Sequence, residues 1–287
     1  MAIGLRTWAD ADELPVADGG EGTLEALHSA LGGNWHEVDV HDAFGRPRTA
    51  RWLELRDGTA AIEAAEAIPL DQARLDPINA SSRGLGEVIA AVGRPRALLV
   101  CLGGTGNVDG GAGMREVVRK LPAPTRVARD VDVPLVDAAR VFAAQKGATA
   151  DQARELERRL FAMDELRPLA DLPGAGAAGG LGAALAALGA ELVRGAELVL
   201  DLIGFEPRGY DLVVTGEGTV DATTIRGKAP GEVLRRCAAV GVRCILFGGR
   251  VVEAPGAVET ISLSGDPARA RADLEDLGAR LARTVEE

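Results

Sequence analysis

The sequence predicts an α/β protein built on a doubly wound parallel sheet. One observation is the apolar run at 96–104, which has the length of a buried strand and ends in glycines. A second is that helical patterns begin directly after glycines, at 110–121 and again at 227–241. Because the order of strand, loop, helix and strand returns at 211–249, these segments are expected to form crossover units. In such sheets ligands bind beside the carboxyl ends of the strands.

Local patterns predict the individual elements. Residues 4–16 are typical of the tail of a helix followed by a short strand, so we expect the sequence to begin within an element. Helical spacing predicts a helix at 24–33 that ends at glycines. Period-two alternation then predicts two strands, at 36–42 and 48–55, and the Asp-Gly turn at 57–58 predicts a third, at 59–65. Together these strands are expected to form an antiparallel meander. The other predicted helices lie at 81–93, 110–121, 150–166, 227–241 and 266–285, and a further, alanine-rich helix is predicted after 172–182. The other predicted strands lie at 96–104, 125–131, 211–218, 242–249 and 257–263.

The composition excludes several classes of protein. Hydrophobic residues make up 47% of the 287 residues, which is enough apolar material for a folded core. Asp and Glu outnumber Lys and Arg by 43 to 32, so the net charge is -11 and no nucleic-acid partner is expected. The odd number of cysteines predicts reduced thiols, and neither a signal peptide nor a membrane segment is recognised. We therefore expect a cytoplasmic protein without a membrane partner.

Lysine is rare in this chain, and two of the three lysines lie beside glycines. Arginine supplies the other basic residues, so Lys146 and Lys228 are candidates for a site that needs a compact ammonium group. Lys120, at a helix end, is expected to be a solvated charge. All three histidines lie at or before position 41, so a general base in the later motifs would be a carboxylate. Any metal there would take oxygen ligands, which favours Mg2+.

Four segments combine glycines with acids or amides next to predicted strands, at 18–23, 103–113, 174–180 and 215–221. Glycine lets the backbone approach a ligand closely, and amides at a helix start bind phosphate. Any one of these loops would serve equally as a tight turn, but four together favour a cleft for a polyphosphate and a small substrate. The candidate nucleotide-binding residues are Gly103, Gly104, Thr105, Asn107, Gly110, Gly111, Gly216 and Gly218.

The standard nucleotide fingerprints are not met. The Gly-Lys pair at 227–228 is followed by alanine instead of Ser or Thr, which excludes a P-loop. The glycines of 174–179 match a dinucleotide motif, but no buried strand is predicted directly before them.

Acidic residues cluster beside the glycine-rich loops. Phosphoryl transfer needs carboxylates that hold Mg2+, a carboxylate that orients the acceptor hydroxyl, and cations or amides on the transferred phosphate. Candidates of each kind are present. The acids are Asp18, Glu21, Asp109, Asp130, Asp132, Glu217 and Asp221. Because Asp130 and Asp132 alternate, at most one of them would face a given site.

Six motifs occur in order along the chain: VADGGEGT at 16–23, DGGAGM at 109–114, DVDVPL at 130–135, QKGA at 145–148, PGAGAAGGLG at 173–182 and TGEG with GKAP at 215–230. Together they resemble the bacterial glycerate kinases that lack a P-loop. The resemblance implies ATP- and Mg2+-dependent phosphorylation of D-glycerate, at position 2 or 3. It also implies a Rossmann-like domain, placed at 1–38, 83–114 and 190–287, with a second α/β domain inserted into it, at 39–82 and 115–189.

This resemblance supports a role for each candidate residue. Asp130, Lys146, Lys228 and Asp18 are the expected catalytic residues, and Asp130 and Glu217 are the expected metal ligands. The expected substrate-binding residues are Asp18, Glu21, Asp109 and Asp221. A homodimer is a further expectation.

The chain departs from the family pattern in places. No loop resembling Asp-Ser-Phe-Lys-Gly-Ser precedes Leu14, so we expect either a start codon upstream of Met1 or a shortened protein. Thr219 stands where the family tends to carry arginine. Two alternatives stay open: a paralogue that binds a small hydroxy acid or nucleotide without phosphoryl transfer, and a Rossmann-type oxidoreductase that uses the glycines of 174–179.

Overall fold

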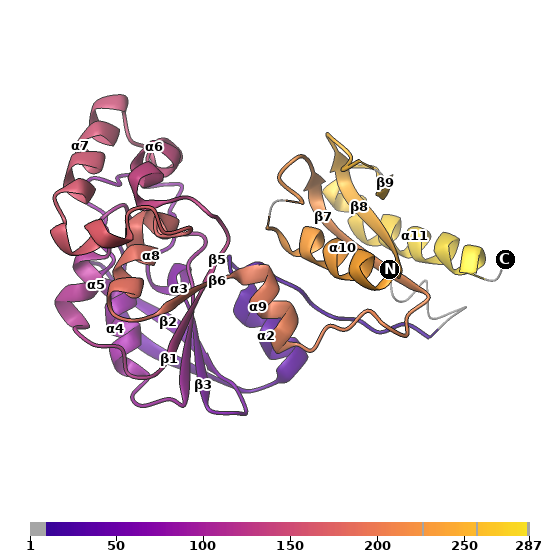
Figure 1. Ribbon diagram of the computed structural model, residues 1–287, viewed down its shortest axis with the longest axis horizontal. Helices are drawn as coiled ribbons and strands as arrows, with labels where there is room; N and C mark the ends of the chain where they lie inside the picture. The colour runs from indigo at the N-terminus through magenta and orange to yellow at the C-terminus, as the bar shows by residue number, and fades with distance from the viewer. Residues whose placement is uncertain (1–9, 226, 257, 286–287) are drawn as a thin grey trace. The chain divides into compact units, whose positions relative to one another are not determined.

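The computed structural model describes residues 10–225, 227–256 and 258–285, and it divides the chain into two compact units (Figure 1). The larger unit is Val16–Ile203. The smaller unit joins the residues up to Pro15 to those from Gly204 onward. Residues 10–18 form neither helix nor strand, so the short strand predicted there is absent, and the helix tail predicted before it lies mostly outside the described residues.

The larger unit contains a six-stranded sheet whose strands follow one another in chain order. The strands are β1 (Asn34–His41), β2 (Pro47–Glu54), β3 (Thr59–Glu63), β4 (Ala97–Cys101), β5 (Thr125–Arg129) and β6 (Glu191–Arg194). The first three pair antiparallel, as the predicted meander requires, and β3 to β6 pair parallel. The predicted α/β class with a mostly parallel sheet is therefore confirmed.

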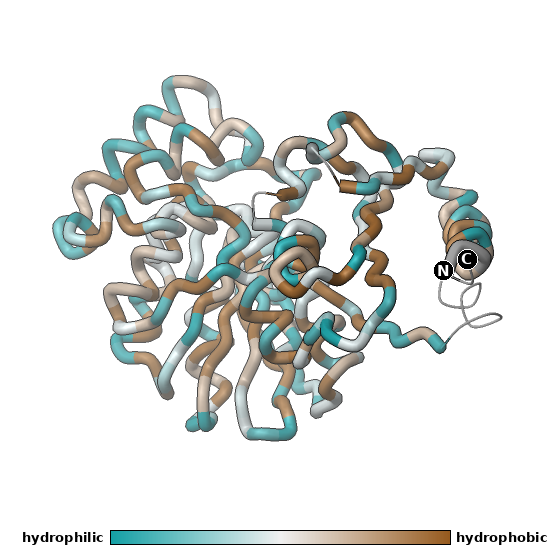
Figure 2. The backbone as a smooth tube through the Cα atoms, turned by 45° about the vertical axis from the view of Figure 1, so that its right-hand side comes forward, coloured by the Kyte–Doolittle hydropathy of each residue, from teal (hydrophilic) through white to brown (hydrophobic). Residues whose placement is uncertain are grey.

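Helices cover both faces of this sheet, because residues of the central strands alternate between two apolar clusters. Leu98 and Val100 belong to the cluster on one face, with helices α4 (Arg83–Ala91), α5 (Ala112–Val117) and α8 (Ala177–Ala187). Leu99 and Cys101 belong to the cluster on the other face, with helices α2 (Thr23–Leu31) and α9 (Gly195–Leu202). Figure 2 shows the hydrophobic stretches of the strands and several hydrophilic turns between them.

Short elements complete the larger unit. Helix α3 (Ala64–Ala67) follows β3, and helices α6 (Ala138–Phe142) and α7 (Ala150–Phe161) lie between β5 and α8. A capping box of Thr149 and Gln152 begins α7. The helix predicted at 150–166 ends at Phe161 and is followed by the 3-10 helix Asp164–Leu169.

The smaller unit contains the parallel sheet β7 (Leu212–Val220), β8 (Arg243–Val251) and β9 (Glu259–Ser262). Helix α10 (Ala229–Val240) and helix α11 (Ala270–Val285) contribute to different apolar clusters of this sheet. Leu246 packs in the cluster that contains Leu234 of α10, and Ile245 packs in the cluster that contains Leu277 of α11. Neighbouring residues of β8 therefore face opposite helices.

The structure groups the chain differently from the domain boundaries in the sequence prediction. Strands β3 and β4, from segments predicted to lie in different domains, pair along their full lengths, and both belong to the larger unit. Strand β6, predicted in the Rossmann-like domain, pairs with β5 from the predicted insertion. The pairing of distant segments, which the local pattern does not encode, determines this grouping. Within the described residues, no helix is long and apolar enough to span a membrane.

Candidate active site

Two glycine-rich loops of the larger unit lie against each other at the carboxyl end of β4. The amide N–H of Gly103 donates to the carbonyl oxygen of Gly19, at 3.2 Å. A Cβ atom on Gly103 would lie 2.4 Å from the Cα atom of Gly20, so only glycine fits there. The same loop touches α9, because a Cβ atom on Gly195 would lie 2.0 Å from the carbonyl oxygen of Asp18. Loop 18–22 is therefore held against two elements by residues without side chains.

Two acids and a lysine of the larger unit interact electrostatically beside these loops. Asp130 follows β5, and burial raises its pKa. The Asp18 carboxylate raises the pKa of Asp130 further, whereas the Lys146 ammonium opposes the shift. Asp132, by contrast, forms ion pairs with Arg129 and Arg194, the latter at 3.1 Å. The two acids thus lie in different surroundings. Both follow the end of β5 at Arg129, so the strand alternation expected from their spacing does not apply to them.

Lys146 is buried, with only 4% of its surface exposed. Its Nζ donates to the carbonyl oxygen of Asn107 at 2.7 Å. Burial lowers the pKa of Lys146 to about 8, although the negative charges of Asp109 and Asp130 act in the opposite direction. The lysine ends the 3-10 helix Ala144–Lys146, and Gly147 follows with a φ of +92°, which turns the chain away. A lysine with such a pKa exchanges its proton readily near neutral pH.

The carboxylate of Asp109 is fully occupied by the protein itself. Its Oδ2 accepts hydrogen bonds from the amide and hydroxyl of Ser82, at 2.8 and 2.7 Å, and from the amide of Gly113 at 3.1 Å. Its Oδ1 accepts from the side chain of Asn107 at 2.9 Å and from the amide of Gly111 at 3.1 Å. These contacts indicate that Asp109 holds loop 107–113 in place. The sequence predicts a different role, a contact between Asp109 and the substrate.

Asn107 connects this loop to the glycine-rich segment 174–180. Its Nδ2 donates to the carbonyl oxygen of Ala178 at 3.1 Å, while its buried Oδ1 has no hydrogen-bond partner among the described residues. Ala178 has a φ of +51°, in the left-handed region that disfavours a side chain. Gly179 follows in the same conformation, where a Cβ atom would lie 2.3 Å from the carbonyl oxygen of Asn107. The glycines of this segment therefore serve close packing, and the element that precedes them is the 3-10 helix Asp164–Leu169.

The smaller unit brings together a second lysine and carboxylate. The Nζ of Lys228, at the start of α10, lies 2.9 Å from the Oε2 of Glu217 in β7. The Oε1 of Glu217 is buried and has no hydrogen-bond partner among the described residues. Asp221 accepts hydrogen bonds from the amide and hydroxyl of Thr223, and these bonds, followed by the charge of Lys228, lower its pKa.

Gly216 and Gly218 lie within strand β7, as the strand predicted at 211–218 requires. A Cβ atom on Gly216 would lie 2.4 Å from the carbonyl oxygen of Phe247 in β8, so close strand pairing explains this glycine. At Gly218, no atom of the described residues, apart from the two chain neighbours, lies within 4 Å of the position that a Cβ atom would take. The backbone there is therefore open to close approach.

The proposed metal ligands, Asp130 and Glu217, belong to different units. Among the described residues, no group of three or more His, Cys, Asp or Glu side chains could hold a metal ion. Mg2+ in kinases is bound by one or two carboxylates together with phosphate oxygens of the substrate, so the protein need not supply a full set of ligands. The unpartnered Oε1 of Glu217 fits such a partial set.

Sequence reasoning missed one carboxylate of the larger unit. Glu63 ends β3 and is only 4% exposed, and its Oε1 accepts the amide N–H of Leu24 at 2.7 Å. Burial raises the pKa of Glu63 to about 7, although this hydrogen bond and one from the amide of Gly22 oppose the shift. Glu63 therefore anchors the turn between loop 18–22 and α2. An acid inside an alanine-rich strand, TAAIEAA at 59–65, was the available signal.

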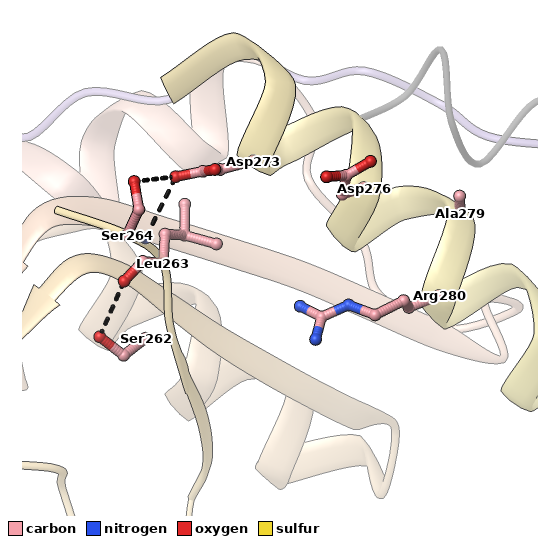
Figure 3. A pocket seen from close by; sticks show the side chains of 7 residues that line it. All are labelled: Ser262, Leu263, Ser264, Asp273, Asp276, Ala279 and Arg280. Carbon is pink, nitrogen blue, oxygen red and sulfur yellow. Dashed lines mark hydrogen bonds between the residues drawn. The ribbon is translucent and has the colours of Figure 1, made fainter. Parts of the chain in front are cut away.

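Neither of two cavities in the structure is lined by the predicted site residues. The cavity in Figure 3, with a volume of about 410 Å³, lies between α11 and the end of β9 in the smaller unit. Asp273 there accepts a hydrogen bond from the amide of Ser264 at 3.1 Å and another from its hydroxyl. A cavity of about 250 Å³ in the larger unit is lined by Asp42, Ala43, Phe44, Arg46, Arg48, Pro69 and Asp71.

An α/β fold with lysines and carboxylates beside glycine-rich loops is typical of enzymes that transfer phosphoryl groups. The chain belongs to the glycerate kinase family, whose model matches residues 1–120 and 119–287. The glycerate kinase of Bacillus subtilis is 35% identical over 87% of this chain and 78% of its own length. The glycerate 2-kinase of Escherichia coli is 37% identical over 76% of this chain and 70% of its own length.

A solved structure agrees with this assignment. The crystal structure of a Salmonella typhimurium LT2 protein described as glycerate kinase 2 superposes with a TM-score of 0.82. That protein is 31% identical in sequence, and the match covers 99% of this chain and 91% of the other. The family resemblance in the motifs is therefore confirmed, and the dinucleotide-dependent oxidoreductase has no support.

Proposed function

We propose that this chain is a glycerate kinase that transfers the terminal phosphoryl group of ATP to D-glycerate in the presence of Mg2+. The observation that carries the proposal is the buried Lys146, which shares a loop cluster with Asp18 and Asp130 in a chain of this family. A buried ammonium group is costly unless an anion or a proton transfer uses it.

In the larger unit, we assign phosphate or carboxylate binding to Lys146 and to the amide of Gly104. Asp130 has a raised pKa, which suits a group that accepts the proton of the attacking hydroxyl. Burial is the main cause of that raised pKa, and the negative charge of Asp18 adds to it. Asp109 and Asn107 position the loop that lies over Lys146, through the hydrogen bonds described above.

In the smaller unit, Lys228 binds phosphate in this proposal, and Glu217 holds Mg2+ through its unpartnered Oε1. Asp130, in the larger unit, is proposed separately as a candidate ligand for Mg2+. When bound, Mg2+ would neutralise charge on the phosphate oxygens. Without a ligand, the ion pair with Glu217 keeps Lys228 at the start of α10 and neutralises both side chains. Glu21 and Asp221 remain candidates for contacts with glycerate.

The chain offers a matched set of variants, because its three lysines include one outside the proposed site. We expect Lys146→Ala and Lys228→Ala each to lower kcat/KM for glycerate by at least about 100-fold, the effect of removing a charge that stabilises the transition state. Lys120→Ala, at an exposed position, is the control and should leave kcat/KM unchanged. The measurement is ADP release with ATP, Mg2+ and D-glycerate.

The same assay separates this proposal from binding without catalysis. If the unsubstituted protein releases no ADP while glycerate or ATP raises its Tm, the chain binds ligands and does not transfer phosphate. Omission of Mg2+ should abolish turnover, and a rate that does not depend on the metal would remove Glu217 and Asp130 from their proposed role. The position of phosphorylation, 2 or 3, follows from NMR of the product.

Two further proposals concern the state of the enzyme in the cell. We propose a cytoplasmic location, in keeping with its reduced cysteines, and a homodimer as the assembly. Light scattering of the purified protein tests whether it is a homodimer.

A further inference from the structure

Cys237 and Cys244 lie on adjacent elements of the smaller unit. Cys237 is in the last turn of α10, and Cys244 is the second residue of β8. Gly241 ends the helix with a φ of +76°, and the amide of Val242 donates to the carbonyl oxygen of Cys237 at 3.0 Å. This glycine-based helix end reverses the chain directly into the strand. As a result, the thiols of Cys237 and Cys244 lie near enough to influence each other's ionisation.

The apolar packing around the pair keeps the two residues together. Cys244 packs in the cluster formed by Val220, Leu234 and Leu246. Leu234 lies on α10, three residues before Cys237, so the strand residue contacts the same helix that carries the second thiol. Cys237 is fully buried, whereas Cys244 is partly exposed. A small oxidant can therefore reach the pair from the side of Cys244.

We propose that Cys237 and Cys244 form an oxidation site, at which a hydroperoxide converts the two thiols to an intramolecular disulfide. The neighbouring thiol of Cys244 lowers the pKa of Cys237, which favours its thiolate. Burial raises the pKa of Cys101, the third thiol, and keeps it protonated. Cys101 is therefore an internal control with the same side chain and no neighbouring thiol among the described residues.

The reaction proceeds in two steps that balance. The thiolate of Cys237 attacks one peroxide oxygen, the O–O bond breaks, and the sulfur becomes a sulfenic acid while the departing oxygen takes up a proton. The sulfur of Cys244 then attacks the sulfenic sulfur, the S–O bond breaks, and the oxygen leaves as water with the thiol proton. The two sulfur atoms are oxidised by two electrons in total, and the peroxide is reduced. A dithiol reagent reverses the link.

Arginines in the sequence make this disulfide easy to identify. Trypsin cleaves after Arg236, Arg243 and Arg250, which places the two cysteines in separate peptides, 237–243 and 244–250. The full-length protein is treated with hydrogen peroxide, free thiols are alkylated in denaturant, and the peptides are identified by mass spectrometry. We expect the linked pair of these two peptides, its loss on treatment with dithiothreitol, and complete alkylation of Cys101.

Variants distinguish the two thiols. Cys244→Ser should leave the sulfenic acid on Cys237, where dimedone traps it, and Cys237→Ser should slow oxidation of Cys244 by at least about tenfold because the favoured thiolate is lost. Cys101→Ser should not change the yield of the linked pair. Recovery of both peptides fully alkylated would overturn the proposal, as would a link to Cys101 or oxidation of Cys237 beyond sulfenic acid without a link.

Discussion

Replacement of Glu63 by glutamine should remove a pH dependence of folding stability that the structure assigns to this one carboxyl group. Glu63 is nearly fully buried behind the turn at Gly22–Leu24, and its pKa is raised to about 7 from 4.5, mainly by burial. The charges of Glu25 and Glu66 also raise it. Glutamine has the same shape, keeps an oxygen that accepts the Leu24 amide, and does not ionise.

The magnitude follows from proton linkage. The folded protein binds the Glu63 proton more tightly than the unfolded chain, so the unfolding free energy falls as pH rises between about 4.5 and 7 and is level above that range. A pKa difference of this size corresponds to about 3 kcal/mol. Because the other groups titrate alike in both proteins, the variant should gain about 3 kcal/mol relative to the original chain between pH 4.5 and pH 8.

Urea unfolding followed by tryptophan fluorescence measures this difference. Trp35 and Trp52, two of the three tryptophans, lie on β1 and β2, so the signal reports on the larger unit that contains Glu63. Glu37→Gln, at an exposed position of β1, is the control and should show no pH-dependent gain. A stability difference between Glu63→Gln and the original chain that is the same at both pH values would refute the reasoning.

Three further substitutions test how the loops are held. Gly195→Ala places a methyl group 2.0 Å from the carbonyl oxygen of Asp18, so we expect a loss of about 1–3 kcal/mol in the urea assay, together with weaker substrate binding as loop 18–22 moves. Ala178→Gly relieves the left-handed conformation at that residue and should change stability by no more than about 1 kcal/mol in the favourable direction, whereas Ala178→Val should lower the urea midpoint. Asp109→Asn turns an amide group toward donors of Ser82 or Gly111 and should cost about 2–4 kcal/mol; an unchanged midpoint would mean that these hydrogen bonds do not hold the loop.

Local sequence patterns predicted the elements whose period is clear. The apolar run at 96–104 contains β4, with boundaries within three residues, and the glycine-bounded pattern at 227–241 contains α10, with boundaries within two. The meander at 36–65 was also recognised, because its first two strands alternate between apolar and polar residues and an Asp-Gly turn precedes the third. The grouping of segments into the two units was not predicted, because it depends on which distant strands pair.

At the candidate site, too, the sequence identified individual residues but not their three-dimensional surroundings. The sequence identified Lys146 and Lys228 through their glycine neighbours, but burial of the first and pairing of the second with Glu217 are three-dimensional facts. Asp109 was selected for its charge, yet its five hydrogen bonds to the protein result from the meeting of two helix starts. Glu63 escaped notice because its contact with the start of α2 joins residues that are 39 positions apart in the sequence.

The most direct test of this account is whether the purified chain makes phosphoglycerate. Phosphorus NMR of a reaction with ATP, Mg2+ and D-glycerate follows ATP, ADP and the phosphate ester in one sample. We expect one phosphoglycerate for each ADP formed, and no ester with the Lys146→Ala protein over the same time. ADP that accumulates with inorganic phosphate and without the ester would contradict the central claim, and so would unchanged ester formation by that variant.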